Sequence, residues 1–366
     1  MSNNDKIKIG FVRLTDSAPL IVAEQLGLYK QHGLDVELQR ERSWAAIRDK
    51  LHANVIQGAQ LLAPLAIAIH GGLMGPAMAM DMSLSLGCNG NAISMSSRCC
   101  AQIRAVGGEL GGNPMVNAQS FGEWVRQRRQ SIKLATVHPY SVHTFQLHAW
   151  LRYAGLNPTQ DVDIVTLPPE QMVDSLMNGH IDGFCVGSPW SSVAVQKGVA
   201  EIMAAGCQLW SQTPEKVLAM PKLWVEQNAE QYDQLLAAVL GACAWLGEPA
   251  NQDKAIAMLA KPEYLDLPPA ALKPAISGEL VLNRLGEQVY VPNYHEFYGR
   301  LANQLSEIQQ QWLLTHMNDC VAEHNMTLED IRSCFNGQTM SRAEQLAGVA
   351  LPEVAGHKMP ALVTLA

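Results

Sequence analysis

The chain has 366 residues, which is enough for two domains of ordinary size. Its hydrophobic content of 48% and charged content of 16% exclude an extensively disordered chain. A formal net charge of −8, without a basic stripe, disfavours direct contact with nucleic acid. The longest apolar stretch, residues 58–80, is interrupted by His70, Gly71, Gly72 and Pro76, so we also expect no membrane-spanning helix.

The N-terminal sequence MSNNDKIKIGFVRL reaches a strand pattern within six residues, and no charged and apolar leader precedes that pattern. We therefore expect a cytoplasmic protein; the alternative is an exported precursor whose leader was removed. The eight cysteines show no CxxC spacing, so nothing indicates a zinc ribbon or a thioredoxin motif. We expect them to be reduced, inert thiols.

The first part of the chain predicts a βαβ unit followed by a further helix and strand. Residues 6–12 read as a strand, residues 20–28 as a helix and residues 33–38 as a second strand. Ser43 is a suitable N-cap for a helix over residues 44–51. Residues 58–64 read as a third strand that ends in a turn at Pro64.

From Pro76 the chain becomes rich in Met and Ser and predicts extended strands that cross between domains, with a tight turn at residues 89–91. Residues 101–130 read as helical. A second βαβ series then follows, with strands at 132–137, 162–167 and 183–186. A later helix covers residues 231–246, and most of the remainder is expected to be helical with proline-containing joints.

These elements predict an α/β protein with a two-lobed, clamp-like architecture and a ligand cleft between the lobes. We expect lobe 1 to comprise residues 1–90 and 205–300, and lobe 2 to comprise residues 91–204. Residues 301–366 are expected to form C-terminal helices and an irregular tail that pack on lobe 1.

The stretch 132–190 indicates where a ligand binds. A buried strand leads through His138, Pro139 and Tyr140 to Ser141, a good N-cap, and a strand that turns directly into a helix presents N–H groups to small anions. A second buried strand ends at the turn 187–190. Ligands of open α/β sheets bind where such strand ends meet, so the sequence predicts half of an anion site here.

Six segments resemble one family in their order along residues 6–300: LTDSAPL, LGLYKQHGLDVEL, SWAAIRDKL, GAQLLAP, HPYSVH and DGFCVGSPW. They resemble the nitrate/bicarbonate solute-binding proteins, the NrtA/CmpA-like family. That family includes the nitrate-binding component of a bacterial ABC importer, its bicarbonate counterpart, and the cytosolic nitrate/nitrite sensor NasS, which restrains the RNA-binding antiterminator NasT. The resemblance is greatest to the NasS branch, and it implies a type II periplasmic-binding-protein fold.

The resemblance also implies a set of ligand-binding residues, namely Trp44, Asn91, His138, Ser141, Gly187 and Lys216. Asn91 stands where the importer proteins more often have Gln, and Ser188 replaces a common Glu. Lys216 stands where the bicarbonate branch has a Glu that helps to hold calcium. The resemblance therefore favours nitrate or nitrite as the ligand, with no metal and no cofactor.

The chemistry of these side chains suits a flat monovalent anion. A buried anion needs a compensating charge, which a mobile Lys216 ammonium can supply, and in-plane donors such as His138 and Asn91. Trp44 would form an apolar wall of the site.

Plainer roles stay open for several of these residues. Trp44 can be a core residue and His138 a loop residue, and Lys222 lies near the same joint as Lys216. Asp16 and Arg48 are more suited to internal salt bridges than to ligand contact. His143 and His148 are five residues apart, which does not favour a metal site on one helix face.

Three functions follow as hypotheses. The first is a cytosolic nitrate/nitrite sensor that holds a NasT-like antiterminator and releases it when ligand binds. The second is the substrate-binding component of a nitrate/nitrite ABC importer, which needs a membrane permease. The third, an enzyme on the same fold, is disfavoured because no GxGxxG, GxxxxGK[ST], GxSxG or HExxH motif occurs and because the cysteine-rich motif of a related thiamine-precursor enzyme is absent.

Overall fold

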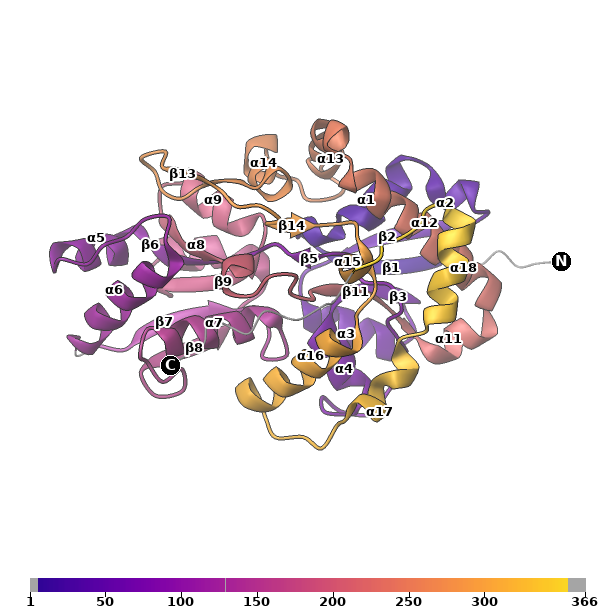
Figure 1. The fold of residues 1–366 in the computed structure, drawn as a ribbon, viewed down its shortest axis with the longest axis horizontal. Helices are drawn as coiled ribbons and strands as arrows, with labels where there is room; N and C mark the ends of the chain where they lie inside the picture. The colour runs from indigo at the N-terminus through magenta and orange to yellow at the C-terminus, as the bar shows by residue number, and fades with distance from the viewer. Residues whose placement is uncertain (1–5, 129, 355–366) are drawn as a thin grey trace. The chain divides into compact units, whose positions relative to one another are not determined.

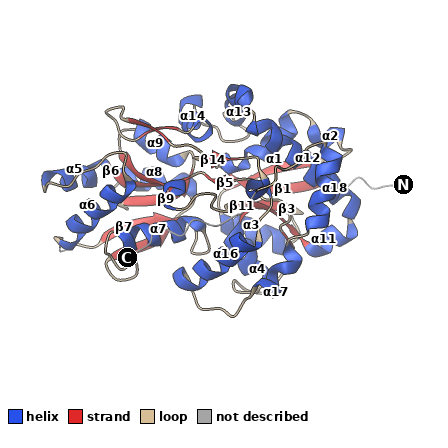
Figure 2. Ribbon diagram, viewed as in Figure 1, coloured by secondary structure: helices blue, strands red, loops and turns tan. Residues whose placement is uncertain are grey.

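The chain folds into two units, each built on its own five-stranded sheet (Figure 1). The computed structural model describes residues 6–128 and 130–354. Of these, unit 1 contains residues 6–88, 214–267 and 296–354, and unit 2 contains residues 89–128, 130–213 and 268–295. Figure 2 shows that helices and strands alternate along much of the chain. Within the described residues, no helix has the length and apolar character needed to cross a lipid bilayer.

The sheet of unit 1 has the strand order β2-β1-β3-β11-β4. Its strands are β1 Ile7–Val12, β2 Val36–Glu41, β3 Gly58–Leu62, β11 Lys216–Pro221 and β4 Met80–Asp81. Strand β1 runs parallel to β2 and β3, whereas β11 is antiparallel to β3. The start of β11 therefore lies at the same edge of the sheet as the ends of β1 and β3.

The helices of unit 1 follow these strands or belong to the later segments. The four that follow early strands are α1 Ala18–Gln25, α2 Leu28–Gln31, α3 Trp44–His52 and α4 Ala63–His70. The later ones are α11 Lys222–Gln227, α12 Ala229–Gly247, α13 Gln252–Leu259, α15 Arg300–Asn303, α16 Glu307–Cys320, α17 Leu328–Ile331 and α18 Gly337–Ala347. Ser43 caps α3 as predicted, since its Oγ accepts the Ala46 N–H at 3.2 Å. Pro64 lies in the first turn of α4 rather than in a loop, a position where its missing N–H costs nothing.

The sheet of unit 2 has the strand order β10-β6-β9-β7-β8. Its strands are β6 Asn91–Ser96, β7 Ile132–Thr136, β8 Val162–Thr166, β9 Gly183–Gly187 and β10 Ala200–Ala205. Strand β7 is parallel to β8 and β9, and β6 is antiparallel to β9. The start of β6 and the ends of β7 and β9 therefore lie at one edge.

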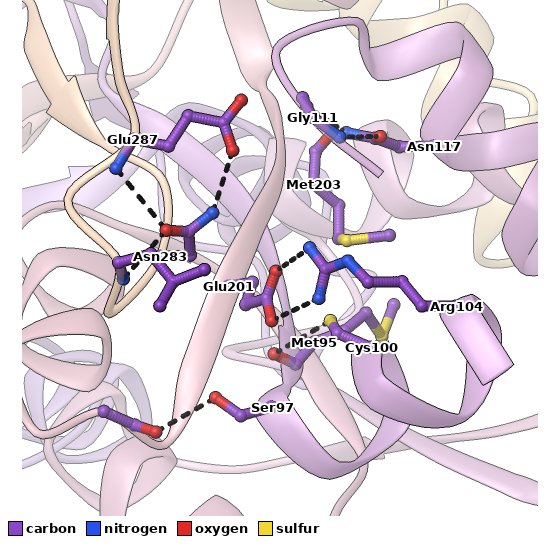
Figure 3. A network of polar contacts seen from close by, with 12 residues as sticks. Met95, Ser97, Cys100, Arg104, Gly111, Asn117, Glu201, Met203, Asn283 and Glu287 are labelled. Atoms are coloured by element: carbon purple, nitrogen blue, oxygen red, sulfur yellow. Dashed lines mark hydrogen bonds and ion pairs between the residues drawn. The ribbon is translucent and has the colours of Figure 1, made fainter. Parts of the chain in front are cut away.

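The helices of unit 2 are α5 Ser97–Ala105, α6 Pro114–Arg126, α7 Val142–Tyr153, α8 Met172–Met177, α9 Trp190–Gln196, α10 Gly206–Leu209 and α14 Pro269–Ser277. Their apolar faces bury a core in which Phe121 lies between Trp124 and Trp150, with ring centroids 5.9 and 5.1 Å away. Polar contacts tie the outer elements together (Figure 3). The Arg104 guanidinium on α5 donates to both Glu201 oxygens on β10 at 2.8 and 2.6 Å, and Asn117 on α6 donates to the Met203 carbonyl at 2.8 Å.

The predicted strands at residues 6–12, 132–137, 162–167 and 183–186 are confirmed to within a residue or two. The predicted helix over 101–130 is wrong in its extent, because α5 and α6 are separated by residues 106–113, and residue 129 lies outside the described residues. The predicted helix over 20–28 is likewise two helices, which meet at Gly27, whose φ of 71° suits glycine.

The boundaries of the two units differ from those expected of the lobes. The chain passes between units at 88/89 and 213/214, and residues 268–295 are grouped with unit 2 rather than with lobe 1. Strands β12 Glu279–Val281 and β13 Gln288–Tyr290 form a hairpin there, and the Ile202 N–H donates to the Leu282 carbonyl at 2.8 Å. The expected irregular tail begins after α18; its last part, residues 355–366, lies outside the described residues.

His148 on α7 makes the stability of the fold sensitive to acid. Burial, and to a lesser degree the charge of Arg152, lowers the pKa of His148 to about 4. Since the unfolded imidazole titrates near pH 6.5, the unfolded chain binds more protons between these two values, and stability is lost as the pH falls from about 6.5 to about 4. Over that window we expect His148 to lower the free energy of unfolding by about 2–3 kcal/mol.

Urea denaturation of the His148→Gln variant at several pH values tests this expectation. The variant should lose less stability than the wild type on acidification, while the exposed His52→Gln control should follow the wild type. Equal pH dependence of all three proteins would contradict the burial of a neutral His148.

Candidate functional site

In unit 1, three charged side chains meet at the edge where β1, β2 and β3 end. We call Asp16, Glu215 and Lys216 the Lys216 cluster. Asp16 lies in the turn after β1, and Lys216 begins β11, where it is paired with Leu62 at the end of β3. The carboxyl ends of parallel strands are where open α/β sheets hold ligands, so the cluster lies at the functional edge.

The Lys216 cluster is completely buried and closely paired. Lys216 Nζ is 2.6 Å from Glu215 Oε2 and 3.2 Å from Asp16 Oδ1, and Lys216 has no exposed surface. Burial alone lowers the pKa of Lys216, yet the two carboxylates outweigh this effect and raise it above its usual value. With all three groups ionised, one cation faces two anions. Lys216 is therefore a fixed ion-pair partner rather than a mobile ammonium, which corrects one assumption made from the sequence.

The two candidate lysines lie at opposite ends of one strand. Lys222 follows β11 at the start of α11, and a six-residue strand such as β11 spans about 20 Å. Lys222 instead lines a separate cavity of about 740 Å³ beside Arg332 and Arg342. Lys216 is therefore the lysine at the functional edge, whereas Lys222 is not.

Of the two residues for which salt bridges were expected, Asp16 pairs with Lys216 inside the protein. Arg48 pairs with its neighbour Asp49 at 2.8 Å, on the surface.

Two further side chains of unit 1 present buried N–H groups. Trp44 opens α3 directly after β2 and is only 1% exposed, and its Nε1 has no hydrogen-bond partner. Gln60 in β3 is completely buried; its Oε1 accepts the Val12 N–H at 2.9 Å, and its Nε2 has no partner. A buried donor without an acceptor costs about 1–3 kcal/mol, so such groups need an explanation.

In unit 2, the His138 loop, residues 138–141, connects β7 to α7 and is held by hydroxyl groups. Ser141 Oγ and Thr144 Oγ1 both donate to the His138 carbonyl, at 2.6 and 2.8 Å. Ser141 Oγ also accepts the Thr144 N–H at 3.2 Å, which confirms the predicted cap of α7. The Ser141 backbone N–H donates to the Pro139 carbonyl. Both donors of Ser141, the backbone N–H and the hydroxyl, are therefore used within the loop.

His138 is 9% exposed, and its ring is oriented by the loop. Nδ1 accepts the Tyr140 N–H at 3.1 Å, so a neutral imidazole carries its proton on Nε2. This is the tautomer required for a neutral N–H donor.

Asn91 and Gly187 lie opposite each other at the same edge, since the antiparallel register of β6 and β9 pairs them. Asn91 is completely buried, and its Nδ2 donates to Gln146 Oε1 on α7 at 3.0 Å. The other nitrogen of this pair, Gln146 Nε2, is buried without a partner. The structure thus brings Asn91, His138, Ser141 and Gly187 together at one edge of the unit 2 sheet.

Within the described part of the chain, no group of three or more His, Cys, Asp and Glu side chains has the arrangement needed to hold a metal ion. All eight cysteines are free thiols, and burial raises the pKa of Cys99 to about 11. A thiol with a raised pKa is a poor nucleophile, since the thiolate is the reactive form.

Sequence reasoning missed Gln60, Gln146 and the paired role of Glu215. A signal was present for Gln60, because it is a lone amide in an otherwise apolar strand, GAQLL in β3. For Gln146 the signal was weaker, because α7 also contains other polar residues. Gln is mostly exposed in proteins, so an amide at a buried position indicates a specific polar contact.

Comparisons with known proteins point to one group. A profile described as the NMT1-like family matches residues 1–260. The nitrate import ATP-binding protein NrtC of Synechocystis sp. (strain ATCC 27184 / PCC 6803 / Kazusa) is 32% identical over 313 residues, which cover 85% of this chain and 45% of NrtC. The nitrate/nitrite binding protein NrtA of Synechococcus elongatus (strain ATCC 33912 / PCC 7942 / FACHB-805) is 30% identical over 282 residues, 75% of this chain and 62% of NrtA. The chain thus spans about half the length of NrtC.

Among solved structures, the crystal structure of the periplasmic nitrate-binding protein NrtA from Synechocystis PCC 6803 superposes with a TM-score of 0.85 at 27% identity. The match covers 93% of this chain and 88% of that one. The α/β fold of a periplasmic binding protein, predicted from the sequence, is confirmed by this likeness.

Proposed function

Since this chain belongs to the NMT1-like family, we propose that it is a binding protein for a small oxyanion, namely nitrate or nitrite. Its similarity to proteins named as nitrate-binding supports this choice of ligand. The observation that carries the proposal is chemical: among the residues that the structure describes, Trp44 Nε1, Gln60 Nε2 and Gln146 Nε2 are buried N–H donors without acceptors.

Such donors suit an anion that only accepts hydrogen bonds. Nitrate and nitrite carry no proton at neutral pH, whereas bicarbonate carries an O–H that must find an acceptor of its own. N–H groups around a charged oxygen form the stronger, charge-assisted class of hydrogen bond. The donor set therefore favours nitrate and nitrite over bicarbonate, without calcium or another cofactor.

Candidate donors or charges are present in each unit, taken by itself. In unit 2, His138 would donate from Nε2, and the edge formed by Asn91 and Gly187 would orient the anion. In unit 1, Lys216 would supply positive charge from the position that Asp16 and Glu215 fix. Because these carboxylates offset that charge, the neutral donors would carry most of the binding.

Titration calorimetry with nitrate, nitrite and bicarbonate, each with and without calcium, tests the ligand. We expect calcium-independent binding of nitrate or nitrite and little response to bicarbonate. The proposal would be contradicted if neither nitrate nor nitrite gave a binding signal, or if only bicarbonate bound and did so only with calcium.

We further propose that the protein is a cytoplasmic sensor that holds a NasT-like antiterminator and releases it when the anion binds. The support is the resemblance of the six motifs to the family that contains the sensor NasS. A ligand shifts an equilibrium between two states through its differential affinity for them. Nitrate should therefore elute the antiterminator from the immobilised protein, while chloride at equal ionic strength should not. Retention of the partner in saturating nitrate would refute the release mechanism.

The similarity to import proteins favours a second candidate, the substrate-binding component of a nitrate/nitrite importer. Fractionation of the native protein separates the two roles. A cytosolic protein associated with an antiterminator supports the sensor, whereas an exported protein associated with a membrane permease supports the importer. We propose no catalytic activity. Chemical conversion of a bound molecule by the purified protein would instead support the enzyme hypothesis.

A further inference from the structure

The side chain of Gln146 is a buried polar group of unit 2 that was not among the site residues inferred from sequence. It lies in the second turn of α7 and has no exposed surface. Its Oε1 accepts the Asn91 Nδ2–H at 3.0 Å, so the oxygen end of the Gln146 amide is held by Asn91. Nε2 is left buried without a hydrogen-bond partner. An amide held in place at one end and unsatisfied at the other is prepared for a ligand acceptor.

The backbone around Gln146 leaves room for this amide. Gly206, the first residue of α10, packs so closely that a Cβ placed there would lie 2.4 Å from Nε2 and 2.7 Å from Oε1. Real Cβ atoms do not approach nitrogen or oxygen so closely, so any larger residue at 206 would displace the Gln146 amide. A larger residue at 206 would therefore act by shifting the Gln146 amide rather than by straining the backbone.

The amide lies at the functional edge of unit 2. Its partner Asn91 opens β6 opposite Gly187, and the His138 loop leads into the helix that carries Gln146. Gln146 is five residues after Ser141, or about 7.5 Å along the helix axis. The Gln146 N–H, the His138 loop and the end of β9 therefore belong to one group of polar atoms within unit 2.

We propose that Gln146 is a direct ligand of the oxyanion, to which it donates its Nε2–H, and that Asn91 is the positioning residue that orients it. This inference rests on the proposed function. Asn91 Nδ2 donates to Gln146 Oε1, so this N–H of Asn91 is used within the protein. The Nε2–H of the longer Gln146 side chain is then the amide donor for the anion. Because the Nε2 atom only donates, it pairs with an acceptor oxygen of the anion.

Two variants of Gln146 with nearly unchanged size separate its donor from its bulk. Gln146→Met keeps a straight side chain but removes the amide, and nitrate affinity should fall about 10- to 100-fold, as expected for a lost hydrogen bond to a charge. Gln146→Glu keeps an oxygen that can accept from Asn91 but replaces the donor with a carboxylate oxygen, so binding should fall further. Gln127→Leu, at an exposed position after α6, is the matched control and should bind as the wild type does.

A double-mutant cycle tests the positioning role of Asn91. Asn91→Ala alone should weaken nitrate binding. When Gln146→Met is added to Asn91→Ala, nitrate affinity should fall by less than about a further threefold, because the two residues act as one unit. A purely structural role would instead lower the thermal midpoint of the ligand-free protein and would show no such coupling in affinity. Gly206→Ala should reproduce the loss of affinity by displacing the amide.

The outcomes distinguish the two proposals. If the wild type binds nitrate or nitrite and Gln146→Met binds equally well, Gln146 is not a ligand, although the proposed function stands. If the wild type binds neither anion, the proposed function falls, and with it the role of Gln146. Loss of affinity in Gln146→Met and Gln146→Glu, with unchanged affinity in Gln127→Leu and with coupling to Asn91→Ala, supports the inference.

Discussion

The Lys216→Met variant is expected to lose about 3–5 kcal/mol of unfolding free energy, because it leaves two carboxylates buried without their cation. Lys216 Nζ contacts both Asp16 Oδ1 and Glu215 Oε2, and none of the three side chains is more than 3% exposed. The free energy of unfolding falls much more when one partner of a buried ion pair is removed than when all partners are removed. The charges that remain after a single removal are still desolvated but no longer paired. Urea denaturation at neutral pH measures the loss.

A matched triple variant separates stability from ligand binding. Asp16→Asn, Glu215→Gln and Lys216→Met together remove every charge of the cluster, so most of the lost stability should return. If the Lys216 ammonium donates directly to the anion, this stable protein should bind nitrate more weakly than the wild type, even though it also loses two carboxylates that repel an anion. Unchanged affinity in the triple variant would remove Lys216 from the site.

Lys222→Met is the control at the other end of β11, and it should alter the unfolding free energy by less than about 0.5 kcal/mol. A stable Lys216→Met protein would contradict the burial of the whole cluster.

The second large effect concerns Trp44, for which Trp44→Ala is expected to cost about 3–5 kcal/mol of unfolding free energy. Trp44 is among the largest completely buried side chains, so its removal leaves a cavity in unit 1. Trp44→Phe keeps a large ring and much of this stability but removes the Nε1–H. Because that N–H has no partner among the described residues 6–128 and 130–354, its loss should lower nitrate affinity about tenfold rather than disrupt the fold.

Trp312→Phe is the control, since Trp312 lies on α16, where its ring centroid is 4.3 Å from that of His316. It should change neither nitrate affinity nor its selectivity over bicarbonate. Trp44→Phe with wild-type affinity would assign Trp44 to the core alone, as the plainer interpretation of the sequence has it.

The two predictions show why a correct residue can still have an unpredicted role. Lys216 and Trp44 were both selected from sequence motifs, one as a mobile cation and the other as an apolar wall. The structure gives Lys216 two carboxylate partners and gives Trp44 a buried donor atom. Both properties depend on neighbours that no motif contains.

The sequence by itself determined the local structure wherever a local signal was strong. Ser43 and Ser141 predicted the starts of α3 and α7, because a cap acts on N–H groups two or three residues away. Buried apolar runs predicted β1, β7 and β9, since burial on both faces favours such runs in parallel strands. The α/β class followed from the alternation of these elements.

Only the tertiary structure decided how distant residues combine. Asp16 and Lys216 are 200 positions apart, Asn91 and Gln146 are 55 apart, and residues 268–295 join a unit that otherwise ends at residue 213. Periodicity and capping report on a few neighbouring residues and carry no information about which strand edges meet. The ion pairs, the oriented amide and the unit boundaries arise from packing and pairing across the whole chain, and these contacts form only when it folds.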